Sequence, residues 1–142
     1  MFSFEQKIRV RYAETDKMGY VYYGNYATYF EVARVEALRS LDVSYKKMEE
    51  NGIILPVYKY SNEFYKPAHY DDELIIKTFI KEMPKTKIHF HFEIINSKNE
   101  LINKAEVTLV FVSLKNNKPC KPPQFLISQL SSYLKWKNTF QN

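Results

Sequence analysis

The stretch YAETDKMGYVYYGNYATYFEVAR, residues 12–34, decides the fold of this chain of 142 residues. It connects a run with strand-like alternation to a run with helical spacing, and it contains two of the chain's three glycines, Gly19 and Gly24. Asn25 follows as a candidate N-cap, because an asparagine side chain can accept a hydrogen bond from a free N–H at a helix start. Apolar residues then recur every three or four positions, which predicts a helix of about 16 residues. These residues are Tyr26, Tyr29, Phe30, Ala33, Ala37, Leu38 and Leu41.

A predicted strand precedes this stretch, and a second helix follows it. Residues 4–12 alternate between apolar and charged side chains, with Ile8, Val10 and Tyr12 on the apolar face. This pattern predicts a half-exposed strand. Downstream of the long helix, residues 44–51 predict a short second helix, since a serine cap begins the segment and a glycine follows it.

Four further strand candidates and a last helix fill the rest of the chain. The strands are predicted at residues 55–68, 73–83, 85–96 and 101–114. Short turns join the last three of them, so these neighbours are expected to run antiparallel. Two prolines at 122 and 123 precede a segment with apolar residues on one face. They predict a C-terminal helix, because proline suits the first turn of a helix.

The order of these elements is a strand, a long helix and four strands in a meander. A ferredoxin-like fold would need a second helix between its third and fourth strands, and the sequence predicts none there. Val32 and Val35 lie off the main apolar stripe of the long helix, so other structure is expected to surround that helix on several sides. We therefore predict an α+β hotdog fold: a curved antiparallel five-stranded sheet wrapped around one long helix, with a short extra helix and a C-terminal helix. The length fits a single domain, residues 1–142.

The composition limits the expected partners and compartment. The net charge is +5, but lysines and arginines are spread along the chain without a block of like charges, so nucleic-acid binding is not expected. No apolar run approaches the ~18 residues that a membrane span needs, and the N-terminus lacks the apolar core of a signal peptide. The single cysteine, Cys120, rules out an intrachain disulfide and predicts a cytoplasmic protein. It lies in the proline-rich segment KPCKPP, where a bystander thiol is expected rather than a nucleophile.

A candidate site lies within the opening stretch. Asp16 precedes the predicted helix start closely enough for a bent loop to bring its carboxylate near that helix end. Helix N-termini offer unpaired N–H groups and a partial positive charge, which stabilise a developing oxyanion. A carboxylate on the other side of the carbonyl could attack it or activate water. These residues alone are equally compatible with an aspartate that only holds the loop.

The residues from Arg9 to Tyr26 spell R-x-R-Y-x-E-T-D-x-M-G-x-V-Y-Y-G-N-Y. This pattern closely resembles the signature of the 4-hydroxybenzoyl-CoA thioesterase family, particularly its bacterial YbgC-like acyl-CoA thioesterases. The likeness continues in the same order through residues 29–45, 52–57 and 65–74. It implies a hotdog acyl-CoA thioesterase that hydrolyses a short-chain or aromatic acyl-CoA. It also implies a homo-oligomer, dimer or tetramer, and no cofactor, because the coenzyme A thioester is the substrate.

The same resemblance implies roles for individual residues. Asp16 is implied to be the nucleophile or general base, and the backbone N–H of Tyr23 to be the oxyanion donor, beside Gly24 and Asn25. Many YbgC-like members carry histidine where this chain has Tyr23, so any duty of that histidine is absent or changed here. The backbone donor survives the substitution, because it needs only the N–H.

Further residues are candidates for binding the substrate. Aromatic and apolar residues of the loop, the helix start and the next strand are expected to line an acyl pocket, although core packing would explain them equally well. They are Tyr20, Tyr22, Tyr26, Val57 and Tyr58. His69, in the segment PAHYDD, is expected in a pocket or subunit-interface loop. The phosphates of coenzyme A require cations, for which Lys85, Lys87 and Lys118 are candidates, with a solvated face as the alternative for each.

Other titratable residues have simpler explanations. Glu14 shares a face with the candidate aspartate in an extended chain, and it is expected to be a solvated loop residue rather than half of a coupled pair. Glu31 and Arg34 are expected to form a helix pair. His89 and His91 share one strand face, but no third ligand lies at suitable spacing, so no metal site is expected.

Two other functions compete with hydrolysis. A hotdog dehydratase or hydratase needs an active-site histidine, and this chain has none before His69. A non-catalytic acyl-CoA-binding or regulatory module remains as the alternative, against which the candidate aspartate and the intact motif argue. An open sheet has edge strands that favour pairing between copies, which agrees with the implied oligomer.

Overall fold

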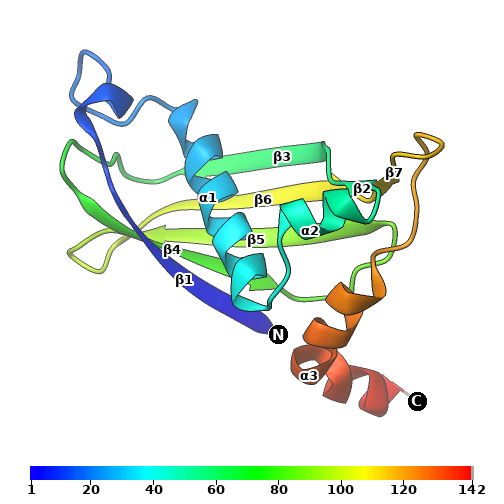
Figure 1. The fold of residues 1–142 in the computed structure, drawn as a ribbon. Helices are drawn as coiled ribbons and strands as arrows, with labels where there is room; N and C mark the ends of the chain where they lie inside the picture. Colours follow the sequence, from blue (N-terminus) through cyan, green and yellow to red (C-terminus); the bar gives the residue numbers. More distant parts are fainter. Residues whose placement is uncertain (142) are drawn as a thin grey trace.

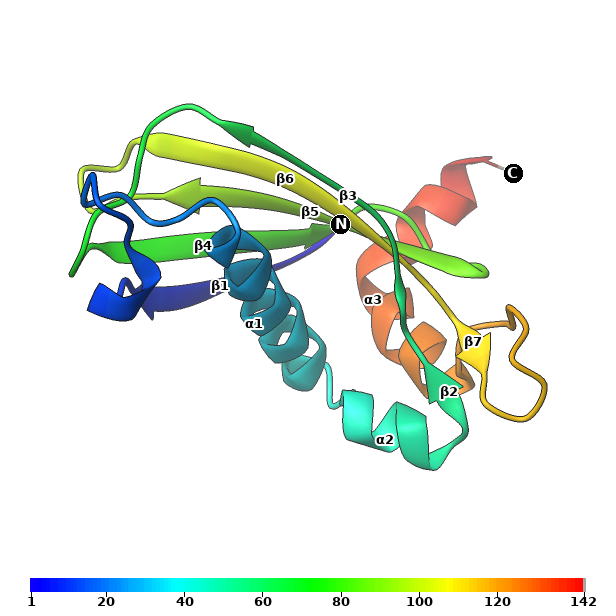
Figure 2. The same cartoon turned by 90° about the horizontal axis from the view of Figure 1, so that it is seen from above.

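The computed structural model describes the backbone of residues 1–141 and the side chains of residues 1–134. A curved sheet forms one layer, and the helices lie against one of its faces (Figures 1 and 2). The elements follow in the order β1 (Phe2–Arg9), η1 (Tyr12–Glu14), α1 (Asn25–Ser40), α2 (Tyr45–Glu50), β2 (Ile53–Ile54), β3 (Val57–Phe64), β4 (Glu73–Ile80), β5 (Lys87–Ile95), β6 (Leu101–Val110), β7 (Val112–Ser113) and α3 (Gln124–Gln141). The predicted long helix, short second helix and C-terminal helix are therefore confirmed.

The main sheet has five strands, all paired antiparallel, in the order β1-β4-β5-β6-β3. The predicted five-stranded antiparallel sheet is confirmed, but the predicted meander is wrong for β3, which pairs with β6 instead of β4. The connection after β3 carries the chain across the end of the sheet, so that β4 forms beside β1 (Figure 1). As a result β3 and β1 are the two edge strands of the sheet.

The core lies between α1 and the concave face of the sheet (Figure 2). Residues of β4 and β5 alternate strictly between buried and more exposed positions, as the sequence pattern predicts for strands with one face on a core. Phe30 of α1 is fully buried, and its ring centroid lies 4.7 Å from that of Phe92 on β5. Burial of each such ring stabilises the fold by about 1.5–3 kcal/mol. The helix is thereby fixed across the sheet, with its N-terminus at one end.

Three details differ from the sequence-based expectations. Strand β1 ends at Arg9, and Tyr12 begins a short 3-10 turn and is 78% exposed, so its predicted place on the apolar face of the strand is wrong. Val32 on α1 is also exposed, so the chain alone does not surround the helix as expected. A small two-stranded sheet, β2 with β7, was not predicted, because two residues are too few to show a periodicity.

The second helix begins and ends as its sequence predicts. The Ser44 hydroxyl accepts a 3.0 Å hydrogen bond from the N–H of Lys47 and caps α2. Gly52 follows the helix with φ at +76°, in the left-handed region that favours glycine.

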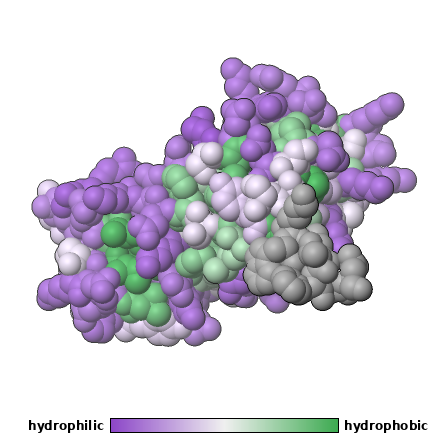
Figure 3. Space-filling model, turned by 90° about the horizontal axis from the view of Figure 1, so that it is seen from below, coloured by the Kyte–Doolittle hydropathy of each residue, from purple (hydrophilic) through white to green (hydrophobic). Residues whose placement is uncertain are grey.

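Seen from below, hydrophilic residues dominate the surface and hydrophobic ones gather in separate patches (Figure 3). Among the described residues, no helix combines the length and apolar character needed to cross a membrane.

Candidate active site

Asp16 begins a tight turn between β1 and α1. Its N–H donates to the carbonyl of Tyr20 over 2.8 Å, and its carbonyl accepts from the N–H of Gly19 over 3.0 Å. The turn requires φ of +80° at Gly19, where a side chain would strain the backbone. Asp16 Oδ1 accepts from the N–H of Met18 and of Tyr20, at 2.9 and 3.2 Å. In the described chain no hydrogen bond reaches Asp16 Oδ2, so one oxygen holds the turn and the other is available.

The start of α1 lies just beyond this turn. Gly24 occupies the N-cap position and Asn25 is the first helical residue, so the predicted cap at Asn25 is wrong. The Asn25 side chain instead donates a 2.8 Å hydrogen bond to the carbonyl of Glu14, which ties the helix to the preceding turn. Within residues 1–141, the N–H groups of Tyr23 and Gly24 have no acceptor. They are free donors at the positive end of the helix.

A cleft of about 350 Å³ joins the aspartate to this helix end. It brings together four of the residues that the sequence singles out: Asp16, Tyr20, Tyr23 and Tyr26. Its other wall comes from the end of β3 and the segment after it, and consists of Phe64, Tyr65, Lys66 and Pro67. The ring of Phe64 packs on that of Tyr26, 5.2 Å between centroids. The strand alternation places Phe64 on the helix side, but the cleft itself depends on contacts between distant segments.

Three of the other candidates do not line the cleft, but they contact or adjoin residues that do. The Tyr22 ring packs against that of Tyr23, with centroids 4.8 Å apart. His69 lies behind Tyr20, with ring centroids 5.2 Å apart, and its N–H donates to a carboxylate oxygen of Asp72 over 2.8 Å. Gly24 contributes its free N–H at the helix start.

The remaining candidates lie at the other end of the sheet. Val57 and Tyr58 begin β3, whereas Phe64 at the cleft ends it, so within one chain they do not line the cleft. The ammonium of Lys87 lies 4.0 Å from the centre of the Tyr58 ring. Lys85 and Lys118 lie in the loops at this same end, before β5 and after β7. The proposed coenzyme A cations are therefore separated from Asp16 by the length of β3.

Glu14 differs most from its sequence-based expectation. It is buried, with a side chain 12% exposed, and is therefore not a solvated loop residue. Its Oε1 accepts from the N–H of Arg11 and from the hydroxyl of Tyr29, each at 2.8 Å. Its Oε2 accepts from Nε and Nη2 of Arg11, at 2.9 and 2.8 Å. The 3-10 turn causes this, because it rotates Glu14 toward the helix while Asp16 continues outward.

The charge of Glu14 is stabilised by these donors. Burial alone would raise the pKa of the Glu14 carboxyl, but hydrogen bonds from the Arg11 N–H, the Tyr29 hydroxyl and the Arg11 side chain outweigh it and lower the pKa. Burial and the hydrogen bond to this carboxylate raise the pKa of Tyr29 well above its usual value. Glu14 is thus an ionised carboxylate beside the candidate site, and its network was not predicted from the sequence.

The predicted pair of Glu31 and Arg34 is replaced by another contact. Arg34 is buried, and its Nε donates to the Tyr45 hydroxyl over 3.0 Å. This contact fastens α1 to the start of α2. In the described part of the chain, Arg34 forms no ion pair with Glu31.

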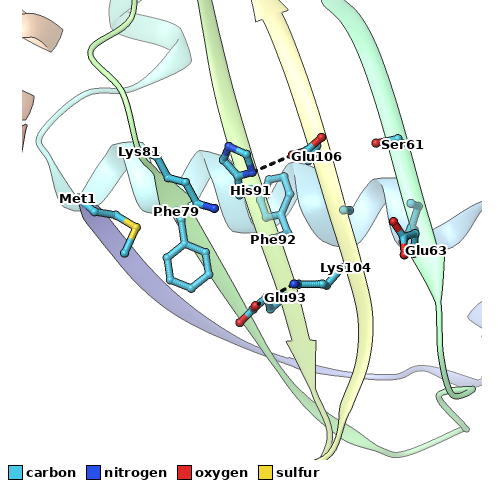
Figure 4. A pocket seen from close by; sticks show the side chains of 12 residues that line it. Met1, Ser61, Glu63, Phe79, Lys81, His91, Phe92, Glu93, Lys104 and Glu106 are labelled. Carbon is cyan, nitrogen blue, oxygen red and sulfur yellow. Dashed lines mark ion pairs between the residues drawn. The ribbon is translucent and has the colours of Figure 1, made fainter.

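The outer face of the sheet carries a second hollow, of about 450 Å³ (Figure 4). His91 lies in it with its Nδ1 3.1 Å from Oε1 of Glu106, and Lys104 pairs with Glu93 over 3.9 Å (Figure 4). His89, on the same face, contacts the Thr108 hydroxyl over 2.9 Å. Among the described residues, no group of three or more His, Cys, Asp or Glu side chains is arranged to hold a metal ion.

A curved antiparallel sheet around one long helix is the hotdog fold. Residues 10–130 match the sequence model described as "Thioesterase-like superfamily", and the chain belongs to this family. It is 36% identical to the acyl-CoA thioester hydrolase YbgC of Escherichia coli over 126 residues, 89% of this chain and 94% of that protein. It is 35% identical to the putative acyl-CoA thioesterase YneP of Bacillus subtilis over 115 residues, 81% and 83% of the two chains. The crystal structure of DHNA-CoA thioesterase from Staphylococcus aureus is similar with a TM-score of 0.81 and 34% identity, covering 99% of this chain and 90% of that one.

Proposed function

We propose that this protein is an acyl-CoA thioesterase that hydrolyses a short-chain or aromatic acyl-CoA to the free acid and coenzyme A. One observation carries the proposal: Asp16 and Tyr23 line the same cleft, and the Tyr23 N–H at the start of α1 has no acceptor in the described chain. A carboxylate and a free helix-end donor on one cleft are the two groups that thioester hydrolysis needs. The relatives named for acyl-CoA hydrolysis support the same conclusion.

The mechanism assigns one task to each half of the cleft. The thioester carbonyl oxygen accepts a hydrogen bond from the Tyr23 N–H, which stabilises the oxyanion by about 3–4 kcal/mol. Asp16 Oδ2 either attacks the carbonyl carbon or removes a proton from an attacking water. In the first route coenzyme A leaves as the thiolate, and water then hydrolyses the mixed anhydride. In the second route water adds directly and the thiolate leaves from the tetrahedral intermediate.

A panel of acyl-CoAs assayed with a thiol reagent tests the proposal. Thiol release that disappears in Asp16→Ala supports the enzyme, whereas wild-type turnover in that variant contradicts the assignment. Single-turnover hydrolysis in heavy-oxygen water tests for direct attack. Label in the Asp16 carboxylate requires an anhydride that water opens at the Asp16 carbonyl. Label only in the product acid is expected from the general base, and also from an anhydride that water opens at the acyl carbonyl.

We also propose that the site lies at the boundary of a homo-oligomer, a dimer or tetramer. The edge strand β3 is exposed along its length and carries aromatic side chains, among them Tyr58, Tyr60 and Phe64. Antiparallel pairing of two β3 edges would bring the start of one strand beside the end of the other. The cations near Lys87 would then lie close to the partner's cleft, where they could bind the phosphates of coenzyme A.

A second candidate function is a non-catalytic acyl-CoA-binding module. It is favoured by the two hydrogen bonds through which Asp16 Oδ1 holds its own turn, a structural duty that requires no chemistry. Tight binding of an acyl-CoA without thiol release would support this module. Under either function we expect a single domain that acts in the cytoplasm, since the one cysteine gives no disulfide to suit an oxidising compartment.

A further inference from the structure

The Glu14 side chain connects two segments that carry the proposed chemistry. Its carboxylate accepts four hydrogen bonds, from the N–H and guanidinium of Arg11 and from the hydroxyl of Tyr29. Arg11 follows β1, and Tyr29 lies on the second turn of α1. The carboxylate therefore ties the end of the first strand to the side of the long helix.

The Glu14 main chain makes a second connection. Its carbonyl accepts a 2.9 Å hydrogen bond from the N–H of Tyr22 and a 2.8 Å hydrogen bond from the side chain of Asn25. Tyr22 directly precedes Tyr23, whose N–H is the proposed oxyanion donor. Asp16 lies only two residues after Glu14 in the chain. Glu14 is thus hydrogen-bonded to the residues on either side of the Tyr23–Gly24 segment and lies two residues before the proposed catalytic aspartate.

We propose that Glu14 is a positioning residue, whose ionised carboxylate fixes the separation between the Asp16 carboxylate and the Tyr23 N–H. This inference rests on the proposed thioesterase function. Glu14 does not itself line the cleft, so it acts through the groups that it holds. The chemistry needs this fixation, because a displacement of about 1 Å between reacting groups can lower a rate by about a hundredfold.

The charge of Glu14 is the part that a neutral side chain cannot replace. All four hydrogen bonds use carboxylate oxygens as acceptors. A glutamine would turn one of these oxygens into an NH2 group, which faces the Arg11 guanidinium with donor against donor. The arginine would swing away and the turn before Asp16 would loosen. A role in stability alone would lower the melting temperature without a separate effect on turnover of the folded protein.

The test compares Glu14→Gln with Tyr29→Phe, which removes one donor and keeps the buried ring. Glu5→Gln and Tyr133→Phe are matched controls, because both side chains are exposed and lie outside the cleft. All variants are assayed well below their melting temperatures. We expect Glu14→Gln to lower kcat by about 10- to 100-fold, and Tyr29→Phe by about 3- to 10-fold, with KM within about threefold of wild type. The controls should retain wild-type kcat.

Wild-type kcat in folded Glu14→Gln, with only a lower melting temperature, would overturn the inference. If Glu14→Gln does not fold, the test rests on Tyr29→Phe. Wild-type kcat in Tyr29→Phe would then overturn the inference. Asp16→Ala is assayed in parallel, so that failure of the proposed catalytic site can be distinguished from failure of the positioning role of Glu14. An active Asp16→Ala refutes the proposed catalytic site, while an inactive Asp16→Ala beside a fully active Glu14→Gln refutes only the positioning role.

Discussion

The Tyr29 hydroxyl, on the second turn of α1, donates a 2.8 Å hydrogen bond to the buried carboxylate of Glu14. This contact joins the core helix to the turn that carries Asp16, two residues further along the chain. The loop of the proposed active site is therefore anchored from inside the core. Asp16 itself is exposed, so the position of its carboxylate depends on a buried neighbour, Glu14.

Asp16→Asn separates the chemical duty of this aspartate from its structural one. Asparagine keeps an Oδ1 acceptor for the N–H groups of Met18 and Tyr20, but it can neither attack the thioester nor take a proton from water. We expect loss of at least about 100-fold in kcat with a melting temperature near wild type. Asp16→Ala should lose activity equally and also about 1 kcal/mol of unfolding free energy, since the turn loses both hydrogen bonds. Equal activity of Asp16→Asn and wild type would contradict the proposed role.

Gly19→Ala tests the backbone of the same turn. A methyl group at Gly19 would meet no heavy atom within 4 Å, so its whole cost comes from the φ of +80°. We expect the unfolding free energy to fall by about 1–2 kcal/mol, measured by chemical denaturation at one protein concentration. Gly19→Asn should cost less, because asparagine tolerates the left-handed region better than alanine. An alanine variant as stable as wild type would show that the turn adopts another conformation in solution.

Local periodicity explains which parts of the fold could be predicted. The spacing of α1 and the alternation in β4 and β5 are properties of neighbouring residues, and the structure confirms these elements. The pairing of β3 with β6 is not local, because it depends on which edge the chain reaches after β3. A connection of few residues can return to the adjacent position or cross the sheet end, and the sequence pattern is the same for both.

In the candidate site, too, local features could be predicted and non-local ones could not. Asp16 and Tyr23 lie in one continuous motif, and the resemblance of that motif to the thioesterase family singled out both. The wall formed by Phe64 and Lys66 was missed, because it reaches the cleft only through the order of the strands. Glu14 shares a face with Asp16 in an extended chain and is expected to be solvated, but a three-residue 3-10 turn directs it into the protein. A single turn of this length is too short to leave a periodic pattern.

We expect His91 to make the free energy of unfolding depend on pH. Burial and the nearby charges of Lys81 and His89 lower the pKa of His91, against the opposing effect of Glu106 and Glu82. The folded protein therefore binds this proton less readily than the unfolded chain, whose histidine has a pKa of about 6.5. As the pH falls from 7 to 5, the unfolded state takes up more protons and the free energy of unfolding decreases.

Substitution His91→Gln should make this decrease shallower over that range, because the site no longer titrates. Denaturation curves at pH 7, 6 and 5 measure this pH dependence of the free energy of unfolding. His69→Gln is the control for loss of an imidazole, because the charge of His69 is not among those that act on the pKa of His91. The same change of slope in both variants would show that His91 is not the group responsible.

If the active site lies at the subunit boundary, two inactive variants should form a mixed dimer that contains one intact site. If Asp16 of one chain works with Lys87 of its partner, a dimer that combines Asp16→Ala with Lys87→Glu contains one intact site and one doubly altered site. After subunit exchange in equal amounts, half of the dimers are mixed, so about a quarter of the wild-type activity should return at low acyl-CoA concentration. Each variant taken alone through the same exchange is the control. If both residues served a site within one chain, every site would keep one defect and mixing would restore nothing.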